Sequence, residues 1–261
     1  MARLLQHWLS APSQCSYLPD QLSSLEYRLM LDVSPEELEH LLARGWRRFG
    51  PAYFRPGCAR CSECVPLRVP VQDFVPSRSQ RRVARRTEGL RMVVGRPQVD
   101  AARLELYHRW HASQGAARGW PEDRIDVEEY YHQFAFPHPS VREAAYYDDA
   151  APGGPRLVGV AIMDETPESL SAVYTYHDPD YHRDSLGTAS VLRQIDEARR
   201  RGKRWVYLGY RVMGCASSRY KARFRPHELL DGWPELNEAP RWRLVWEPEE
   251  PLEVGDVVKR R

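Results

Sequence analysis

Three cysteines stand three residues apart at Cys58, Cys61 and Cys64, and Cys15 lies upstream of them. Thiolates at positions i, i+3 and i+6 in a segment interrupted by Pro and Gly can converge on one ion, and Cys15 could supply a fourth ligand. Four thiolates suit structural zinc or an iron–sulfur cluster equally well. The alternative is a set of buried free thiols, since five cysteines without a secretory context predict no disulfide framework.

A second group consists of five arginines with spacings of 3, 1, 3 and 1 and no acidic residue among them: Arg78, Arg81, Arg82, Arg85 and Arg86. In a helix they would lie along one face. That face could follow a phosphate backbone or bind carboxylates in bidentate pairs. The alternative is a solvated surface.

A third segment, residues 181–188, leads into a predicted helix and ends in Ser185, Leu186, Gly187 and Thr188. Gly187 would allow a ligand to approach the backbone closely, and a helix N-terminus offers free N–H donors to an anion. The alternative is an ordinary helix cap by Ser185 or Thr188.

A fourth group interleaves aromatic and basic residues at Tyr207, Tyr210, Lys221 and Arg223. This pattern suits base stacking and phosphate contact, or else a core strand followed by a solvated loop. Only three of the 38 basic residues are Lys, so a position that keeps Lys, such as Lys221, could require a compact ammonium.

The elements that must position these groups alternate along the chain. Helical periodicity and capping signals, among them Ser34 with Glu37, predict helices over 35–44, 78–86, 101–113, 127–134 and 189–201. Strands are predicted over 144–147, 157–163, 170–176 and 205–210. The order indicates an α+β fold and is similar to that of GNAT-like acyltransferases. We place a boundary at the linker 95–97, which gives a smaller Cys-containing N-terminal domain (1–96), packed on a C-terminal transferase domain (97–236), and a tail (237–261).

Composition restricts the class of protein. With 261 residues, 42% hydrophobic and 28% charged, the chain is neither disordered nor a coiled coil. Its mean hydropathy of −0.63 and its short apolar runs predict no membrane helix. Residues 1–96 hold 15 Arg and nine acidic residues, whereas the remainder is net acidic. This asymmetry indicates a polyanionic partner for the first half or a segregated solvated surface. Because the N-terminus shows no secretory signal, we expect a soluble, cytoplasmic protein.

Ordered motifs in both halves of the chain resemble one family. The N-terminal half carries Arg47-Arg-Phe-Gly-Pro-Ala-Tyr-Phe-Arg-Pro56, the cysteine run, Pro66-Leu-Arg-Val-Pro70 and Ser77-Arg-Ser-Gln-Arg81. The C-terminal half carries Ser171-Ala-Val-Tyr-Thr-Tyr176, Asp178-Pro-Asp180, Ser185-Leu-Gly-Thr188, Tyr207-Leu-Gly-Tyr210 and Tyr220-Lys-Ala-Arg-Phe224. Over about residues 13–236 the chain resembles the aminoacyl-tRNA–protein transferases of the N-end rule pathway. Within that family it is most similar to the bacterial aspartate/glutamate leucyltransferases.

The resemblance implies transfer of leucine from leucyl-tRNA to the N-terminal amine of proteins beginning with Asp or Glu, which creates a destabilising N-terminus for degradation. It implies aminoacyl-tRNA and acceptor proteins as partners, a monomer, no membrane, no DNA and no cofactor for the transfer. Arginyl-tRNA as donor, a CoA-dependent N-acetyltransferase and a non-catalytic adaptor are the alternatives. Arginyltransferases carry a CxxC pair and a CC pair, which Ser16-Tyr17-Leu18 and Ser62 interrupt here. Zinc and an iron–sulfur cluster at Cys15, Cys58, Cys61 and Cys64 are therefore both open.

The implied chemistry assigns roles to the motif residues. An ester is already activated, so the enzyme mainly has to orient the amine, assist proton removal and stabilise the oxyanion. Asp178 or Asp180 is the candidate proton acceptor, and the backbone around Leu186, Gly187 and Thr188 is the candidate oxyanion donor. Lys221 and Arg223 are expected to contact the terminal phosphates of the tRNA, and Tyr207 or Tyr210 to stack on its last adenine. The acceptor carboxylate is expected to bind Arg55, Arg68, Arg78, Arg81 or Arg82. Further candidate substrate-binding residues in the same motifs are Tyr174, Tyr176 and Ser185.

Overall fold

Capping boxes fix the start of the first two helices. Helix α1 (Pro35–Leu42) begins where the Ser34 side chain accepts from the Glu37 amide and the Glu37 side chain accepts from the Ser34 amide. Helix α2 (Arg78–Arg86) begins with the same reciprocal box at Ser77. Each box satisfies amides that lack a partner in the first helical turn. Both predicted helices are confirmed.

The long helix α5 (Leu186–Arg200) is fixed by its apolar face. Val191, Leu192, Ile195 and Ala198 recur at helical spacing and are all buried. Gly202 follows the helix in the left-handed region, at φ +66°. The predicted helix is therefore confirmed, and it starts three residues earlier than expected.

The structure, a computed structural model, describes residues 2–118 and 124–247. Its remaining helical segments are α3 (Ala101–Arg118), α4 (Val127–Tyr130) with the π-turn Tyr131–Ala135, the short turns Pro179–Asp184 and Tyr220–Arg223, and α6 (Ala216–Arg219).

Most of the strands belong to two sheets. The smaller sheet is antiparallel, in the order β1 (Arg3–Leu9), β4 (Leu25–Leu31), β6 (Ala52–Pro56), β5 (Arg47–Phe49). The larger has the order β14 (Trp242–Val245), β13 (His227–Leu230), β7 (Val65–Pro70), β12 (Trp205–Arg211), β11 (Ser169–His177), β10 (Arg156–Glu165), β9 (Val141–Asp148), β8 (Leu90–Gly95). A separate pair joins β2 (Ser13–Gln14) and β3 (Leu22–Ser23).

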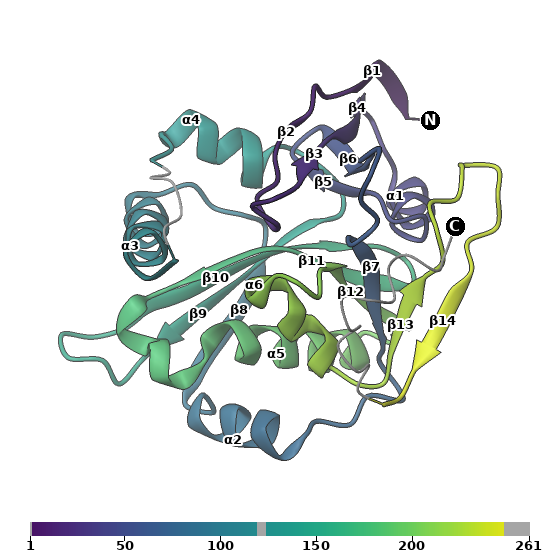
Figure 1. Ribbon diagram of the computed structural model, residues 1–261. Coiled ribbons are helices and arrows are strands. Elements are labelled where there is room, and N and C mark those ends of the chain that lie inside the picture. The colour runs from purple at the N-terminus through teal and green to yellow at the C-terminus, as the bar shows by residue number, and fades with distance from the viewer. Residues whose placement is uncertain (1, 119–123, 248–261) are drawn as a thin grey trace.

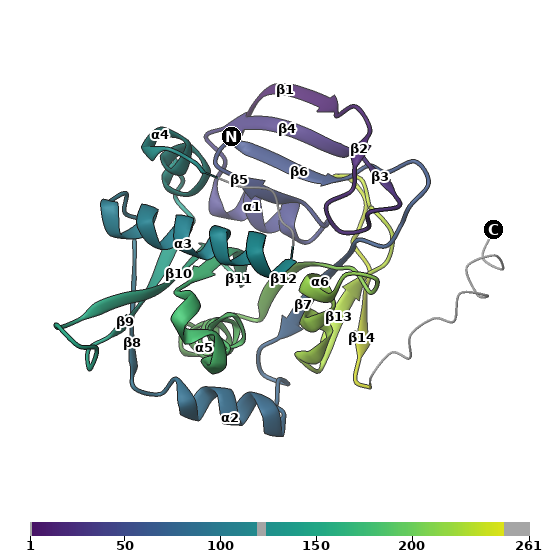
Figure 2. The same ribbon diagram turned by 60° about the vertical axis from the view of Figure 1, so that its left-hand side comes forward.

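Helices cover both faces of the large sheet. Helix α5 packs on β11 and β12, with α2 beside it, and α3 packs on β10 and β11 from the opposite face. The small sheet and α1 lie at one end of this layered unit and carry their own core around Trp46 and Tyr53 (Figures 1 and 2). The α+β class and the presence of an N-terminal domain are confirmed.

The boundary expected at residue 96 does not separate the two sheets. Strand β7 lies in the middle of the large sheet, between β12 and β13, and β8 forms its far edge. Both strands precede residue 96, so the first segment of the chain supplies part of the second domain. The pattern of local elements could not reveal this, because strand order is set by long-range pairing.

The expected tail also begins too early. Strand β14 pairs with β13 from Trp242 to Val245, so residues within 237–261 belong to the sheet. Residues 248–261 lie outside the described residues.

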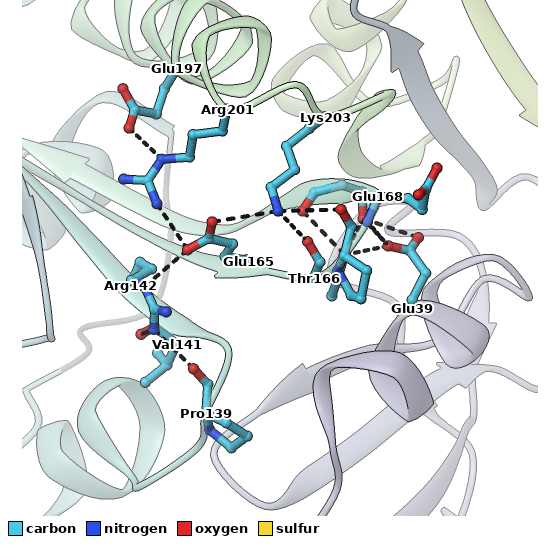
Figure 3. Close-up of polar contacts among 12 residues, drawn as sticks. Glu39, Pro139, Val141, Arg142, Glu165, Thr166, Glu168, Glu197, Arg201 and Lys203 are labelled. Atoms are coloured by element: carbon cyan, nitrogen blue, oxygen red, sulfur yellow. Dashed lines mark hydrogen bonds and ion pairs between the residues drawn. The ribbon is translucent and has the colours of Figure 1, made fainter.

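The junction between α1 and the large sheet is polar. The Glu39 carboxylate accepts from the hydroxyls of Thr166 and Ser169 and from the Glu168 amide at the β10–β11 turn (Figure 3). Lys203 donates to the Thr166 carbonyl beside it. Because these hydrogen bonds satisfy polar groups of the turn, they hold α1 against the sheet.

Candidate functional site

The large sheet opens at the one place where its neighbouring strands run parallel. Strands β11 and β12 pair only from Ser169 to Ser171, opposite Trp205 to Tyr207. A bulge follows Tyr207, and Gly209 adopts φ +80°, so β12 turns away from the second half of β11. The separation leaves backbone groups of the two strands without the partners that a continuous ladder would supply.

Two cations bind the carbonyls at this opening. Arg47, from β5 of the small sheet, donates to the Ser171 hydroxyl at 2.8 Å and to the Ala172 carbonyl. Lys221 donates to the Tyr210 carbonyl at 3.0 Å. Both cations flank Gly209: the Arg47 guanidinium carbon and the Lys221 Nζ would each lie 3.6 Å from a Cβ added there.

Sequence reasoning missed Arg47, because it treated that residue only as part of a motif. Lys221 was singled out, but as a phosphate contact. Burial and the neighbouring Arg47 lower the pKa of Lys221 to about 8. The unusual retention of Lys was the one usable signal for this position.

The N-terminus of α5 carries no side-chain cap. Ser185 adopts the left-handed conformation at φ 56°, and its side chain makes no capping hydrogen bond. Nothing lies within 4 Å of a Cβ placed on Gly187. The alternative of an ordinary cap by Ser185 is therefore wrong, and the first amides of α5, which no side chain caps, are candidate donors to an oxyanion or phosphate.

The two candidate proton acceptors, Asp178 and Asp180, are both ion-paired. Asp178 is fully buried and binds Arg109 through both oxygens, at 3.0 and 3.1 Å, and Arg156. Asp180 is exposed and contacts the same two arginines. A hydrogen bond from Arg156 helps to lower the pKa of Asp180, which makes it a weaker base. In this geometry Asp178 and Asp180 stabilise the turn that precedes α5.

Three of the candidate tyrosines belong to the core. Tyr176 is fully buried and shares a 2.6 Å hydrogen bond with Tyr130. Tyr207 accepts from Arg68, and Tyr210 donates to the Gly45 carbonyl at 2.9 Å. These side chains pack in the core and, at 5% exposure or less, have no face free to stack on adenine. The core-strand alternative therefore fits Tyr207 and Tyr210.

Tyr174 occupies an intermediate position. It is half-buried, its hydroxyl lies 2.9 Å from His111 Nε2, and its ring stacks on Phe134. It lies on β11 beyond the last residue paired with β12, so it remains a candidate wall of the opening.

Two of the arginines expected to read a carboxylate already bind one. Arg55 donates to Glu26 and Glu235. Arg68 donates to Glu228, and its guanidinium carbon lies 4.0 Å from the centre of the Trp205 ring and 4.2 Å from that of Trp242. Both arginines are buried, and their ion pairs stabilise the folded structure.

The α2 arginines form a continuous basic surface. Gln80 and Val83 face inward, whereas all five arginines of the helix are exposed. Arg86 makes a long 3.9 Å contact with Asp184 near the start of α5. Gln80 donates to the Arg223 carbonyl, and the Arg223 side chain is exposed. The predicted basic helix thus lies next to the segment that carries Lys221.

The four candidate thiols share one neighbourhood without forming a coordination shell. Burial and the thiols of Cys15, Cys58 and Cys61 raise the pKa of Cys64 to about 12. Within residues 2–118 and 124–247, no three His, Cys, Asp or Glu side chains are arranged to hold a metal ion. The side chains as placed do not fit zinc or a cluster, and no chemical step is assigned to one.

Comparisons with known proteins match both halves of the chain. A family model described as the N terminus of arginine-tRNA-protein transferase matches residues 13–82, and the model of its C terminus matches residues 102–231. A protein from Helicobacter hepaticus named aspartate/glutamate leucyltransferase is 33% identical over 92% of this chain and 98% of its own length. A Pseudomonas putida protein of the same name is 36% identical over 89% and 97%.

The chain belongs to the aspartate/glutamate leucyltransferase family. In this family member the opening draws on both matched segments, with Arg47 from the first and Lys221 from the second. Among solved structures, FemX aligns with a TM-score of 0.45 and 9% identity over 78% of this chain and 79% of that chain. None of the helices in the described part of the chain is both long and apolar enough to span a membrane.

Proposed function

We propose that the chain transfers leucine from leucyl-tRNA to the N-terminal amine of polypeptides that begin with Asp or Glu. The observation that carries this proposal is the identity of 33–36% to aspartate/glutamate leucyltransferases over about 90% of the chain. An arginyl donor and a CoA-dependent acetyltransferase have less support, because these relatives are all named as leucyltransferases. We further propose that the protein acts as a monomer in the cytoplasm, where aminoacyl-tRNA is available.

The reaction is an acyl transfer. The acceptor amine attacks the ester carbonyl, a C–N bond forms, the C–O bond to the tRNA terminus breaks, and the amine proton ends on the released ribose hydroxyl. Much of the acceptor amine is already neutral near its ordinary pKa of about 7.7–8.0. Orientation and oxyanion stabilisation are therefore the main demands on the protein.

We place the transfer between the opening of β11 and β12 and the start of α5. The uncapped amides of Leu186 and Gly187 have the chemistry of an oxyanion site. Parallel strands joined through α5, with a bulge where they separate, support the GNAT-like acyltransferase assignment. Asp178 or Asp180 can accept the amine proton only after its ion pairs with Arg109 and Arg156 open.

The tRNA surface is proposed to be α2 together with Arg223. Five exposed arginines without an acid on the helix suit the contiguous phosphates of an acceptor stem. A carboxylate reader would require a more enclosed position. The turn Tyr220–Arg223 connects this surface to Lys221 at the opening.

The test is to incubate purified protein with an Asp-initiated peptide and labelled leucyl-tRNA, arginyl-tRNA or acetyl-CoA. Label should pass from leucyl-tRNA to the peptide. Transfer from arginyl-tRNA or acetyl-CoA alone would replace the proposal with the corresponding alternative, and binding of tRNA without any turnover would indicate an adaptor.

A further inference from the structure

We infer that Arg47 and Lys221 together bind the side-chain carboxylate of the acceptor's first residue. This inference rests on the proposed function and assigns its acceptor specificity to two named side chains.

The first observation is a pair of cations without an anion. Within the described residues, neither the Arg47 guanidinium nor the Lys221 ammonium contacts a carboxylate; they donate hydrogen bonds to a hydroxyl and two backbone carbonyls. The acidic side chain that acts on Arg47 electrostatically is Asp164, which is already paired with Arg48. Buried like charges repel and are poorly solvated, so a bound anion would stabilise the pair.

The second observation is the space between the cations. Gly209 separates them, and its missing side chain leaves both charged groups 3.6 Å from the point where a Cβ would be. A carboxylate has two oxygens and accepts from a guanidinium and an ammonium at once. The positive φ of Gly209 disfavours a side chain there, which keeps this space free.

The third observation removes the competing arginines. Arg55 and Arg68 are saturated by Glu26, Glu235 and Glu228. The α2 arginines are exposed, where water screens a carboxylate pair. Arg47 is only 9% exposed and can discriminate a carboxylate from its neutral amide much more strongly.

A carboxylate fits this place better than an RNA phosphate does. A backbone phosphate carries a ribose on both sides and needs an open groove, whereas the first side chain of a polypeptide ends in a free carboxylate. Tyr17 lies close enough for its electrostatics to couple with Arg47, and the Leu18 side chain packs against Gly214. The segment around Tyr17 therefore lies beside the pair.

The test compares the full chain with Lys221→Gln, Lys221→Arg and Arg47→Lys. Binding of fluorescein-labelled peptides that begin with Asp or Asn is measured by anisotropy without RNA, and leucine transfer is measured separately. The wild type should favour Asp, and Lys221→Gln should lose at least about 30-fold of that preference, the factor equivalent to about 2 kcal/mol. Lys221→Arg should retain most of it. Arg91→Gln, at an exposed ion pair with Asp149, is the matched control.

The outcomes separate the two proposals. Unchanged Asp-to-Asn preference in folded Lys221→Gln and Arg47→Lys variants would overturn the inference, as would a loss of leucyl-tRNA affinity alone, which would make the pair a phosphate contact. A wild type that prefers Asp through Lys221 yet transfers no aminoacyl group would leave this inference standing and refute the proposed function. Thermal unfolding identifies variants that fail to fold. If Arg47→Lys fails to fold, the result for Lys221→Gln alone decides the test.

Discussion

Arg48 on β5 and Asp164 on β10 form a buried ion pair between the two sheets, with Arg48 Nε 3.1 Å from Asp164 Oδ2. Their side chains are 4% and 1% exposed. Asp164→Asn should lower the free energy of unfolding by about 3–5 kcal/mol, because it leaves the guanidinium buried without its counter-charge. Urea denaturation measures this loss. Replacing both residues by apolar ones of similar size should cost less than the single change, and equal costs would contradict the argument.

The α2 surface predicts a change in salt dependence. Arg82→Gln with Arg85→Gln should weaken leucyl-tRNA binding and reduce the slope of log affinity against log salt by about 2, one for each lost phosphate contact. Filter binding over a salt series provides the measurement, with Arg91→Gln as control. A slope identical to that of the wild type would remove α2 from the RNA surface.

Arg68 should affect stability and leave acceptor choice alone. Arg68→Gln loses the Glu228 contact and the stacking between Trp205 and Trp242, and we expect about 2 kcal/mol of destabilisation. The ratio of transfer to Asp- and Asn-initiated peptides should match the wild type. A lower ratio would show that Arg68 contributes to recognition of the acceptor carboxylate.

His138 makes the protein sensitive to mild acid. Its Nδ1 accepts from the Ser140 amide and its Nε2 lies 3.0 Å from the Tyr53 hydroxyl. Burial, with Arg48 and Arg96 nearby, lowers its pKa to about 3. The unfolded chain, with an ordinary pKa near 6.5, binds the proton first, so stability falls as pH decreases from about 6.5 toward 3.

His138→Gln should therefore reduce the loss of stability between pH 7 and pH 5 by about 2 kcal/mol. Urea unfolding at the two pH values measures the difference. An identical pH dependence in the variant would show that the folded structure does not lower the pKa of His138.

Cys64 should resist alkylation. Its raised pKa of about 12 leaves little thiolate at pH 8, so iodoacetamide should modify it at least about 100-fold more slowly than in the unfolded chain. Mass spectrometry of timed samples follows the reaction. A chelator that accelerates the modification would indicate a bound metal and restore the four-thiolate site; a chelator without effect agrees with free thiols.

Local signals predicted what is locally determined. Ser34 with Glu37 and the face from Val191 to Ala198 lie within one or two helical turns, so α1 and α5 could be placed from the sequence. The pairing of Arg68 with Glu228 spans 160 residues, and it turns a candidate ligand reader into part of the core. The site at Gly209 likewise depends on Arg47 arriving from the small sheet, which no spacing along the chain records.

The central position of β7 has a consequence for how the protein is made. This strand leaves the ribosome early, but both of its neighbours in the sheet, β12 and β13, come from the last quarter of the chain. Its edges stay unpaired during most of synthesis, which exposes an apolar strand to aggregation and delays final assembly until translation is nearly complete. Premature termination anywhere before β13 would leave a partner strand missing, so nascent fragments should be targets for chaperones and proteases.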